Sequence, residues 1–135
     1  DIVVIGDQSG TNTLKVIGNI QYTGTSTDIS DSRLKENVEP LTGSLDKICQ
    51  LEAKSYTMVD DEDKTEELGF IAQDVQQIFP NLVREHTNEE KPEGERGDPF
   101  LSVAYIQLIA PMVEAIKELK SENEALKTRV AALES

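Results

Sequence analysis

A heptad repeat at the C-terminal end is the sequence feature that most restricts how this chain folds. Apolar residues recur at alternating intervals of three and four, with a single asparagine among them: Ile109, Met112, Ile116, Leu119, Asn123, Leu126, Val130 and Leu133. These residues occupy positions a and d, which form the seam of a coiled coil, and an asparagine at position a fixes the register of such a seam. The repeat predicts a long helix over residues 109–135 that pairs with copies of itself.

The charges beside this seam favour a parallel pairing. Glu122 and Arg129 fall at position g, and Lys127 and Glu134 fall at the e positions five residues later. These positions meet as pairs of opposite sign in a parallel, in-register coiled coil. The alternative is one amphipathic helix on its own domain, which has a broader apolar stripe. Pro111 lacks a backbone donor and marks either the start of the helix or a kink.

The composition indicates a small core and excludes some partners. Apolar residues make up 37% of the 135 residues, aromatic residues only 4%, and tryptophan is absent. Elongated elements, or a core completed by other chains, fit these values better than one core-rich domain. The net charge of −13 disfavours nucleic acid and anionic membrane surfaces, which attract Lys and Arg. No apolar run approaches the roughly 20 residues of a membrane span.

Three parts follow one another in a predicted α+β architecture. Residues 1–29 alternate apolar and polar side chains, with turn chemistry at residues 6–10, and predict the end of a β stalk. Residues 30–108 predict a small mixed domain, and residues 109–135 the helix. Because two strands are not stable alone in water, neighbouring copies are expected to complete the stalk. The chain starts at Asp1 inside an apolar run, as a piece of a longer polypeptide would.

Short elements alternate with polar loops in the middle part. A helical turn is expected over residues 33–38, and a helix is expected around residues 45–51 with Thr42 as its cap. A second helix is expected over residues 72–79, where Pro80 stops it. The remaining segments are predicted as strands around residues 56–59 and 82–83, and as loops at residues 60–67 and 86–98.

The stretch Ser-Asp-Ser-Arg-Leu-Lys-Glu-Asn-Val at residues 30–38 is the most distinctive in the chain. A second stretch, Leu-Gly-Phe-Ile-Ala-Gln-Asp-Val at residues 68–75, runs on to Phe79-Pro80. With the terminal heptads, these motifs resemble the intramolecular chaperone domain of endosialidase-type phage tailspikes and tail fibres. The resemblance covers about residues 28–135. It implies a homotrimer that folds the β-structured segment upstream of it in the same chain, and then cuts itself off.

The resemblance also implies a cleavage site and a dyad. The cut falls between Ile29 and Ser30, with Ser30 as the nucleophile and Lys35 as the base. A lysine amine accepts a proton only after it has lost its own charge, which desolvation or a nearby cation promotes. Arg33 is a candidate for that cation, and Asn37 is a candidate for stabilising the oxyanion.

Ser30 and Lys35 cannot meet on a regular element. Five residues apart, they lie about 140° apart around a helix and on opposite faces of a strand. The backbone must therefore turn between them, or the lysine must act on the serine of another chain. The structural alternative is that Ser30, Asp31 or Ser32 caps a short helix and that Lys35 is a solvated cation. In the cleaving interpretation, Asp31 supports the dyad.

Other side chains are weaker candidates. Cys49 lies among apolar residues and is predicted to be a small core residue, rather than half of a thiol–imidazole pair with His86. The acidic run at residues 60–63 lacks the glycine and the terminal glutamate of an EF-hand, so we expect a solvated loop and no metal. A lone cysteine excludes an internal disulfide and a multi-cysteine zinc site. No cofactor is expected.

Two rival functions remain: a trimerisation module that does not cleave, and a receptor-binding fibre tip that uses the loops at residues 60–67 and 86–98. In the cleaving interpretation, the protein acts once on its own chain as a serine endopeptidase. It is made in the host cytoplasm, its parent protein reaches the virion tail, and the chaperone domain is released. The heptads alone do not separate a trimer from a dimer, so the number three comes from the resemblance.

Overall fold

The computed structural model describes residues 1–6, 13–89 and 91–135, in two compact units, residues 1–38 and 39–135. The described part of the first unit has one regular element, the 3₁₀ turn η1 (Ser32–Leu34). The strands expected within residues 1–29 do not form in the described part of that segment, and the turn expected at residues 6–10 lies outside it except for its first residue. A single chain offers such strands no partner for their backbone groups, which is the physical reason.

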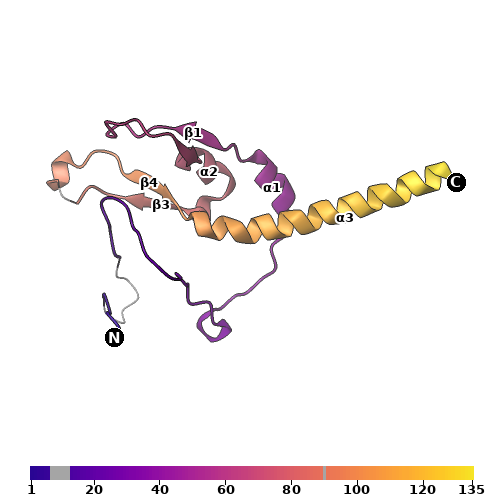
Figure 1. Cartoon of the computed structure of the whole chain (residues 1–135), viewed down its shortest axis with the longest axis horizontal. Coiled ribbons are helices and arrows are strands. Elements are labelled where there is room, and N and C mark those ends of the chain that lie inside the picture. Colours follow the sequence, from indigo (N-terminus) through magenta and orange to yellow (C-terminus); the bar gives the residue numbers. More distant parts are fainter. Residues whose placement is uncertain (7–12, 90) are drawn as a thin grey trace. The chain divides into compact units, whose positions relative to one another are not determined.

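The described residues of the second unit have the predicted α+β character, with two antiparallel strand pairs and three α-helices (Figure 1). Strand β1 pairs with β2, and β3 pairs with β4. The elements in chain order are α1 (Ser44–Gln50), β1 (Lys54–Tyr56), β2 (Glu67–Gly69), α2 (Ala72–Ile78), η2 (Pro80–Leu82), β3 (Val83–His86), η3 (Glu93–Glu95), β4 (Phe100–Val103), η4 (Tyr105–Leu108) and α3 (Ile109–Glu134).

The core of the second unit forms around helix α2. Val75 is fully buried, and Phe79, Leu82 and Leu108 pack in the same cluster. Val75 and Phe79 are four residues apart, so they lie on the same side of the chain at the end of α2. Pro80 follows and begins η2, which confirms its expected role as the stop of the helix.

Helix α1 packs on α3 and begins without a side-chain cap of its own. Its N-cap is Gly43 and not the expected Thr42, and the glycine backbone is left-handed, with φ of 66°. Glycine adopts this conformation without steric cost. The backbone N–H groups of Ser44 and Leu45 instead donate to the two carboxylate oxygens of Glu118 on α3, each at 3.0 Å. A distant glutamate therefore supplies the cap of α1.

Helix α3 packs on its own unit with one face and leaves its heptad face open. Pro111 and Ala115 are buried, and the partly buried Glu118 continues their stripe. The hydrophobic residues at a and d are all exposed, from 48% for Met112 to 86% for Leu133. The second half of α3 projects beyond α1 with no other element of the unit beside it (Figure 1).

Two further observations concern the helices. Pro111 is the third residue of α3, so of its two expected roles it takes the start of the helix, where its missing donor removes no hydrogen bond. Within the described residues, no helix has the length and apolar character that a membrane crossing requires.

Candidate functional site

The side chains of Ser30 and Lys35 meet within one chain. Lys35 Nζ donates a hydrogen bond to Ser30 Oγ at 2.5 Å. The backbone turns between them through η1, in which the Leu34 N–H donates to the Asp31 carbonyl at 3.1 Å and the Lys35 N–H to the Ser32 carbonyl at 3.2 Å. This turn is the first of the two arrangements that the five-residue spacing allows. Both side chains of the pair are exposed to solvent in the single chain.

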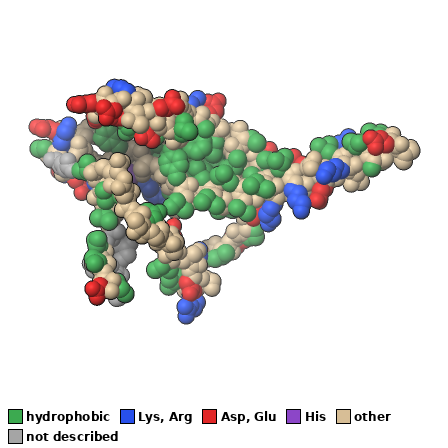
Figure 2. Space-filling model, viewed as in Figure 1, with side chains coloured by type: hydrophobic (Ala, Val, Ile, Leu, Met, Phe, Trp, Pro, Cys, Tyr) green, Lys and Arg blue, Asp and Glu red, His purple; other side chains and the backbone are tan. Residues whose placement is uncertain are grey.

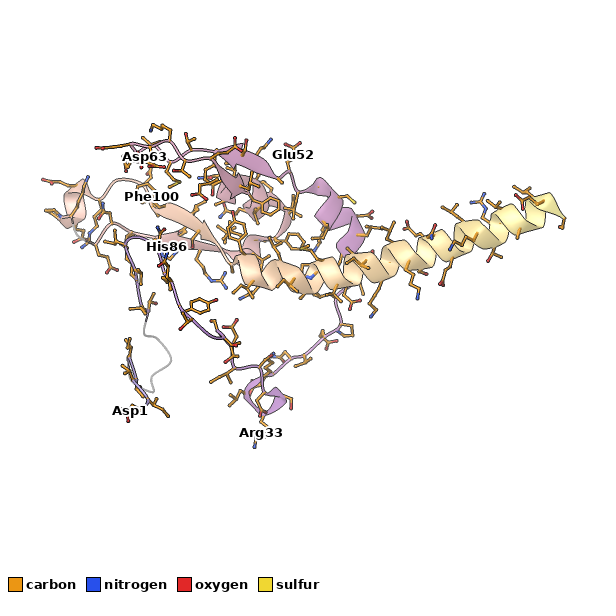
Figure 3. The ribbon with its side chains drawn as sticks, viewed as in Figure 1. Asp1, Arg33, Glu52, Asp63, His86 and Phe100 are labelled. Atoms are coloured by element: carbon orange, nitrogen blue, oxygen red, sulfur yellow. The ribbon has the colours of Figure 1, made fainter. Side chains whose placement is uncertain are left out.

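Asp31 caps this turn and also binds Arg33. Its Oδ1 accepts a hydrogen bond from the Arg33 backbone N–H at 2.8 Å, and its carboxylate accepts two from the guanidinium, at 3.0 and 2.8 Å. The guanidinium bonds, followed by the backbone bond, hold the pKa of Asp31 below its ordinary value. The same pairing raises the pKa of Arg33. Arg33, labelled on this turn in Figure 3, is therefore the ion-pair partner of Asp31.

The expected capping role and the contact between Ser30 and Lys35 thus occur together. Asp31 is the N-cap of η1, as the structural alternative required, while Ser30 Oγ bonds Lys35. Asn37 has a left-handed backbone, with φ of 54°, which asparagine tolerates better than most residues. Within the described residues, no hydrogen bond joins the Asn37 side chain to Ser30 or Lys35. Ile29 is 86% exposed, so the Ile29–Ser30 peptide lies in an accessible stretch.

Cys49 is exposed, so the prediction that it is a core residue is wrong. Helix α1 turns Ser44 and Ile48 inward, four residues apart, and the thiol one position further along falls outside that stripe. His86 on β3 lies against β4, with its Nε2 at 2.5 Å from Ser102 Oγ. Figure 3 labels His86 and Phe100, which are paired in the register of these two strands.

The acidic loop between β1 and β2 is organised by Asp61. Its Oδ1 accepts from the Asp63 N–H at 3.1 Å and its Oδ2 from the Thr65 N–H at 2.9 Å. The bond from Thr65 contributes most to lowering the pKa of Asp61. Lys64 Nζ donates to the carbonyls of residues 58 and 59. Among the described residues, no three His, Cys, Asp or Glu side chains gather as a metal site would need.

The second motif, at residues 68–75, builds the packing of the domain. The Phe70 N–H donates to the Tyr105 hydroxyl at 2.9 Å, and this hydroxyl donates to the Phe70 carbonyl at 3.3 Å. The two rings stack with their centroids 6.0 Å apart. A Cβ at Gly69 would lie 2.5 Å from the Tyr105 oxygen, so a side chain at this position displaces the hydroxyl.

The sequence reasoning missed Glu118. The available signal was a second periodic stripe on α3, outside the a and d positions, formed by Leu108, Pro111, Ala115 and Glu118 at intervals of three and four. A carboxylate that ends an otherwise small or apolar stripe needs a donor when it packs inward. The Gly43 that precedes α1 without a capping side chain was the matching signal on the other helix.

Comparison with known proteins places the first motif in a family. The family model described as "Chaperone of endosialidase" (Peptidase_S74) matches residues 30–84. Long tail fiber protein Gp37 of Enterobacteria phage K3 is 33% identical over 104 residues, which cover 75% of this chain and 8% of that protein. Gp37 of Enterobacteria phage M1 is 34% identical over 104 residues, covering 73% and 39%. A probable tail fiber protein of Escherichia phage Phieco32 is 28% identical over 131 residues, covering 96% and 16%.

A solved structure is also similar to part of the chain. It is titled as a crystal structure of a novel intramolecular chaperon and aligns with a TM-score of 0.49 and 18% identity, over 69% of this chain and 99% of the other. The chain spans well under half the length of each curated relative above. Through residues 30–84, this chain belongs to the peptidase S74 family, the chaperones of endosialidase, and it is homologous to phage long tail fibre proteins.

Proposed function

We propose that this domain assembles three copies of a phage tail fibre chain, promotes folding of the β-structured segment upstream, and then cuts its own chain between Ile29 and Ser30. Ser30 is the nucleophile and Lys35 the general base. The observation that carries this proposal is the 2.5 Å contact between Lys35 Nζ and Ser30 Oγ across the η1 turn. Membership of a peptidase family supports an autoproteolytic activity, and the family match begins at residue 30.

The proposed cleavage takes place in two steps. Neutral Lys35 Nζ accepts the hydroxyl proton while Ser30 Oγ attacks the Ile29 carbonyl carbon. The tetrahedral intermediate collapses when the bond from this carbon to the Ser30 nitrogen breaks and Lys35 returns the proton to that nitrogen. The product is an ester between Ile29 and the Ser30 oxygen, with a free amino group on Ser30. Water then hydrolyses the ester to the Ile29 carboxylate and restores the Ser30 hydroxyl.

The surrounding turn supports this assignment. Lys35 Nζ donates a hydrogen bond to Ser30 Oγ in the structure. In the proposed reaction the proton passes between the same two atoms, but from Ser30 Oγ to Lys35 Nζ. The bond network of Asp31 holds the chain reversal in place, so Asp31 and Arg33 support the dyad by fixing the turn. Ser30 and Lys35 are exposed in the single chain. We infer that neighbouring copies cover them in the assembly and desolvate the amine, which favours its neutral form.

The open heptad face supports assembly through α3. Because its own unit packs on Pro111 and Ala115, the a and d residues are free to form the seam of a parallel trimeric coiled coil. Figure 2 shows hydrophobic side chains continuing from the body of this unit onto the near part of α3, and charged side chains of both signs along its projecting half. Such a coil raises the effective concentration of the upstream strands, which must pair between chains.

The relatives suggest the setting of this activity. They are tail fibre proteins, so the parent of this chain is proposed to reach the virion tail after synthesis in the host cytoplasm. Residues 1–29 would then stay with the fibre as its stalk, and residues 30–135 would leave. Release removes the route by which the assembled fibre could unfold with the help of its chaperone, and leaves a kinetically stable product.

Mass spectrometry of the freshly expressed chain tests the cleavage. We expect a product of residues 30–135 from the wild-type chain and uncut protein from Ser30→Ala and Lys35→Ala. Lys35→Arg is the sharper variant, because arginine keeps the positive charge and the donor but does not act as a base at neutral pH. It should also stay uncut. The matched control is Ser32→Ala, whose side chain makes no hydrogen bond within the described turn and which should cleave normally.

Sedimentation of the uncut Ser30→Ala chain tests the assembly and should give the mass of a trimer. Cleavage that persists in Ser30→Ala would remove the proposed nucleophile. Cleavage at the wild-type rate in Lys35→Arg would remove the lysine as base while leaving the serine in place. A monomeric uncut chain would remove the coiled coil.

A further inference from the structure

A cavity of about 320 Å³ lies where the start of α1 meets η2, η4 and the first turn of α3. Its apolar wall includes Phe79, Leu82 and Pro111, which are all buried. The residues that line it all belong to the second unit. A concave site of this size with a largely apolar wall is typical of pockets that take small organic ligands.

Four polar side chains also line the cavity: Ser44, Lys47, Asn81 and Gln107. Within the described residues, none of these side chains makes a hydrogen bond or an ion pair, and the bonds of Ser44 and Asn81 use their backbone groups. Ser44 is only 3% exposed, yet no side-chain oxygen in the described part of the chain is both enclosed and unpaired. The Ser44 hydroxyl therefore opens into the cavity and is available to a ligand.

Lys47 gives the cavity a positive charge in a chain whose net charge is −13. The described lining contains no aspartate or glutamate that would neutralise this charge. Lys47 Nζ lies 5.7 Å from the centre of the Phe79 ring, a distance at which an aromatic face attracts a cation. Because Ser44 and Lys47 are three residues apart on α1, they lie on the same face of that helix. A ligand with one negative group and an apolar body matches this lining.

Pairing of the heptad seam does not itself cover the cavity. Ala110 and Pro111, which line it, fall at positions b and c of the repeat that has Ile109 at position a. These positions lie outside the seam formed by positions a and d. The cavity is therefore compatible with the proposed coiled coil.

We propose that this cavity binds a small organic carboxylate. Its apolar group lies against Phe79, Leu82 and Pro111, and its carboxylate accepts hydrogen bonds from Lys47 and Ser44. A hydrogen bond to a charged group is about twice as strong as a neutral one, so the lysine selects an acid over its neutral analogue. The apolar wall selects an organic anion over an inorganic one. The inference does not rest on the proposed self-cleavage, because the cavity lies wholly within residues 39–135.

Methyl NMR of the full chain, titrated with phenylacetate, tests the site. The methyl signals of Leu41 and Leu82, which both line the cavity, should shift and saturate. The dissociation constant should be on the order of 1 mM, as is reasonable for a ligand of about ten non-hydrogen atoms. Phenylacetamide, which has a similar shape and no charge, should bind about tenfold more weakly. Inorganic phosphate, which has no apolar group, should not displace phenylacetate at an equal concentration.

Three variants assign the polar contacts. Lys47→Met keeps a long apolar side chain without the charge and should weaken phenylacetate binding about tenfold. Ser44→Ala removes the hydroxyl, leaves the backbone bond to Glu118, and should weaken binding about threefold. Lys117→Met is the matched control, because it removes the same charge from a lysine that pairs with Glu114 and does not line the cavity. It should bind phenylacetate as the wild-type chain does.

Equal affinities for phenylacetate and phenylacetamide would overturn the inference, as would shifts that do not saturate or displacement by phosphate. Unchanged affinity in Lys47→Met would remove the lysine as the group that binds the carboxylate. If Lys47→Met does not fold, as shown by the loss of its thermal unfolding transition, the comparison of acid and amide on the wild-type chain decides alone. The same measurements apply whether or not the chain cuts itself, so failure of the dyad and failure of this site are distinguishable.

Discussion

Replacing Gly69 with alanine tests the packing role of the second motif. The added Cβ would lie 2.5 Å from the Tyr105 hydroxyl oxygen and 3.3 Å from that of Tyr56. The Tyr105 side chain must move, and both of its hydrogen bonds to Phe70 are lost. Two neutral hydrogen bonds contribute about 0.5–1.5 kcal/mol each, and overpacking costs about 1–3 kcal/mol. We therefore expect Gly69→Ala to lower the free energy of unfolding by about 2–6 kcal/mol.

Urea unfolding of the uncut Ser30→Ala chain measures this loss, at one fixed protein concentration because assembly contributes to stability. Tyr105→Phe is the matched variant, since it removes the hydroxyl and leaves the ring that stacks on Phe70. Because both hydrogen bonds of the hydroxyl are lost, it should cost about 1–3 kcal/mol. Adding Gly69→Ala to Tyr105→Phe should then cost less than about 1 kcal/mol, because the new methyl group takes the space of the missing oxygen. Costs that simply add in the double variant would refute this reasoning.

Three further predictions concern the core, the η1 turn and the thiol. Val75→Ala, at a fully buried site, should destabilise the protein by about 2–3 kcal/mol in the same urea assay, whereas Val59→Ala, 89% exposed, should change it by less than about 0.5 kcal/mol. The Asp31 carboxyl should titrate below its ordinary pKa by NMR, so its stabilisation of the turn persists above that ordinary value and disappears as the pH falls through the lowered one; Arg33→Ala should return it to normal. Cys49 should react with a thiol reagent in the folded protein, and reaction only after unfolding would contradict its exposure.

Sequence patterns predicted the positions of the helices better than their caps and their contacts with distant segments. The heptads located the helix from Ile109, and the apolar spacing with Pro80 located α2, because both signals are local and repeated. The five-residue spacing also allowed two arrangements, and the structure contains the first, a turn between Ser30 and Lys35. In these cases the information lies within a few residues of the element itself.

Contacts between distant segments were not predictable in the same way. Thr42 was chosen as the cap of α1 because capping is usually local, but the acceptor comes from Glu118 on another helix. Cys49 was predicted to lie in the core because its neighbours are apolar. The short helix α1 buries only the face that carries Ser44, and Cys49 lies outside that face. The role of Gly69 depends on Tyr105, which lies far along the chain, so only the folded arrangement reveals it.

The division of α3 into two faces has a consequence for how such modules diversify. One face of α3 packs on the domain through Pro111, Ala115 and Glu118, and the other carries the exposed a and d residues of the heptad repeat. In the proposed coiled coil, substitutions at the a and d positions are therefore expected to alter partner choice, stoichiometry or strength of association without disturbing the fold of the individual chain. On that proposal, a designer could exchange the heptad residues of α3 and keep the contacts of Pro111, Ala115 and Glu118 with the domain.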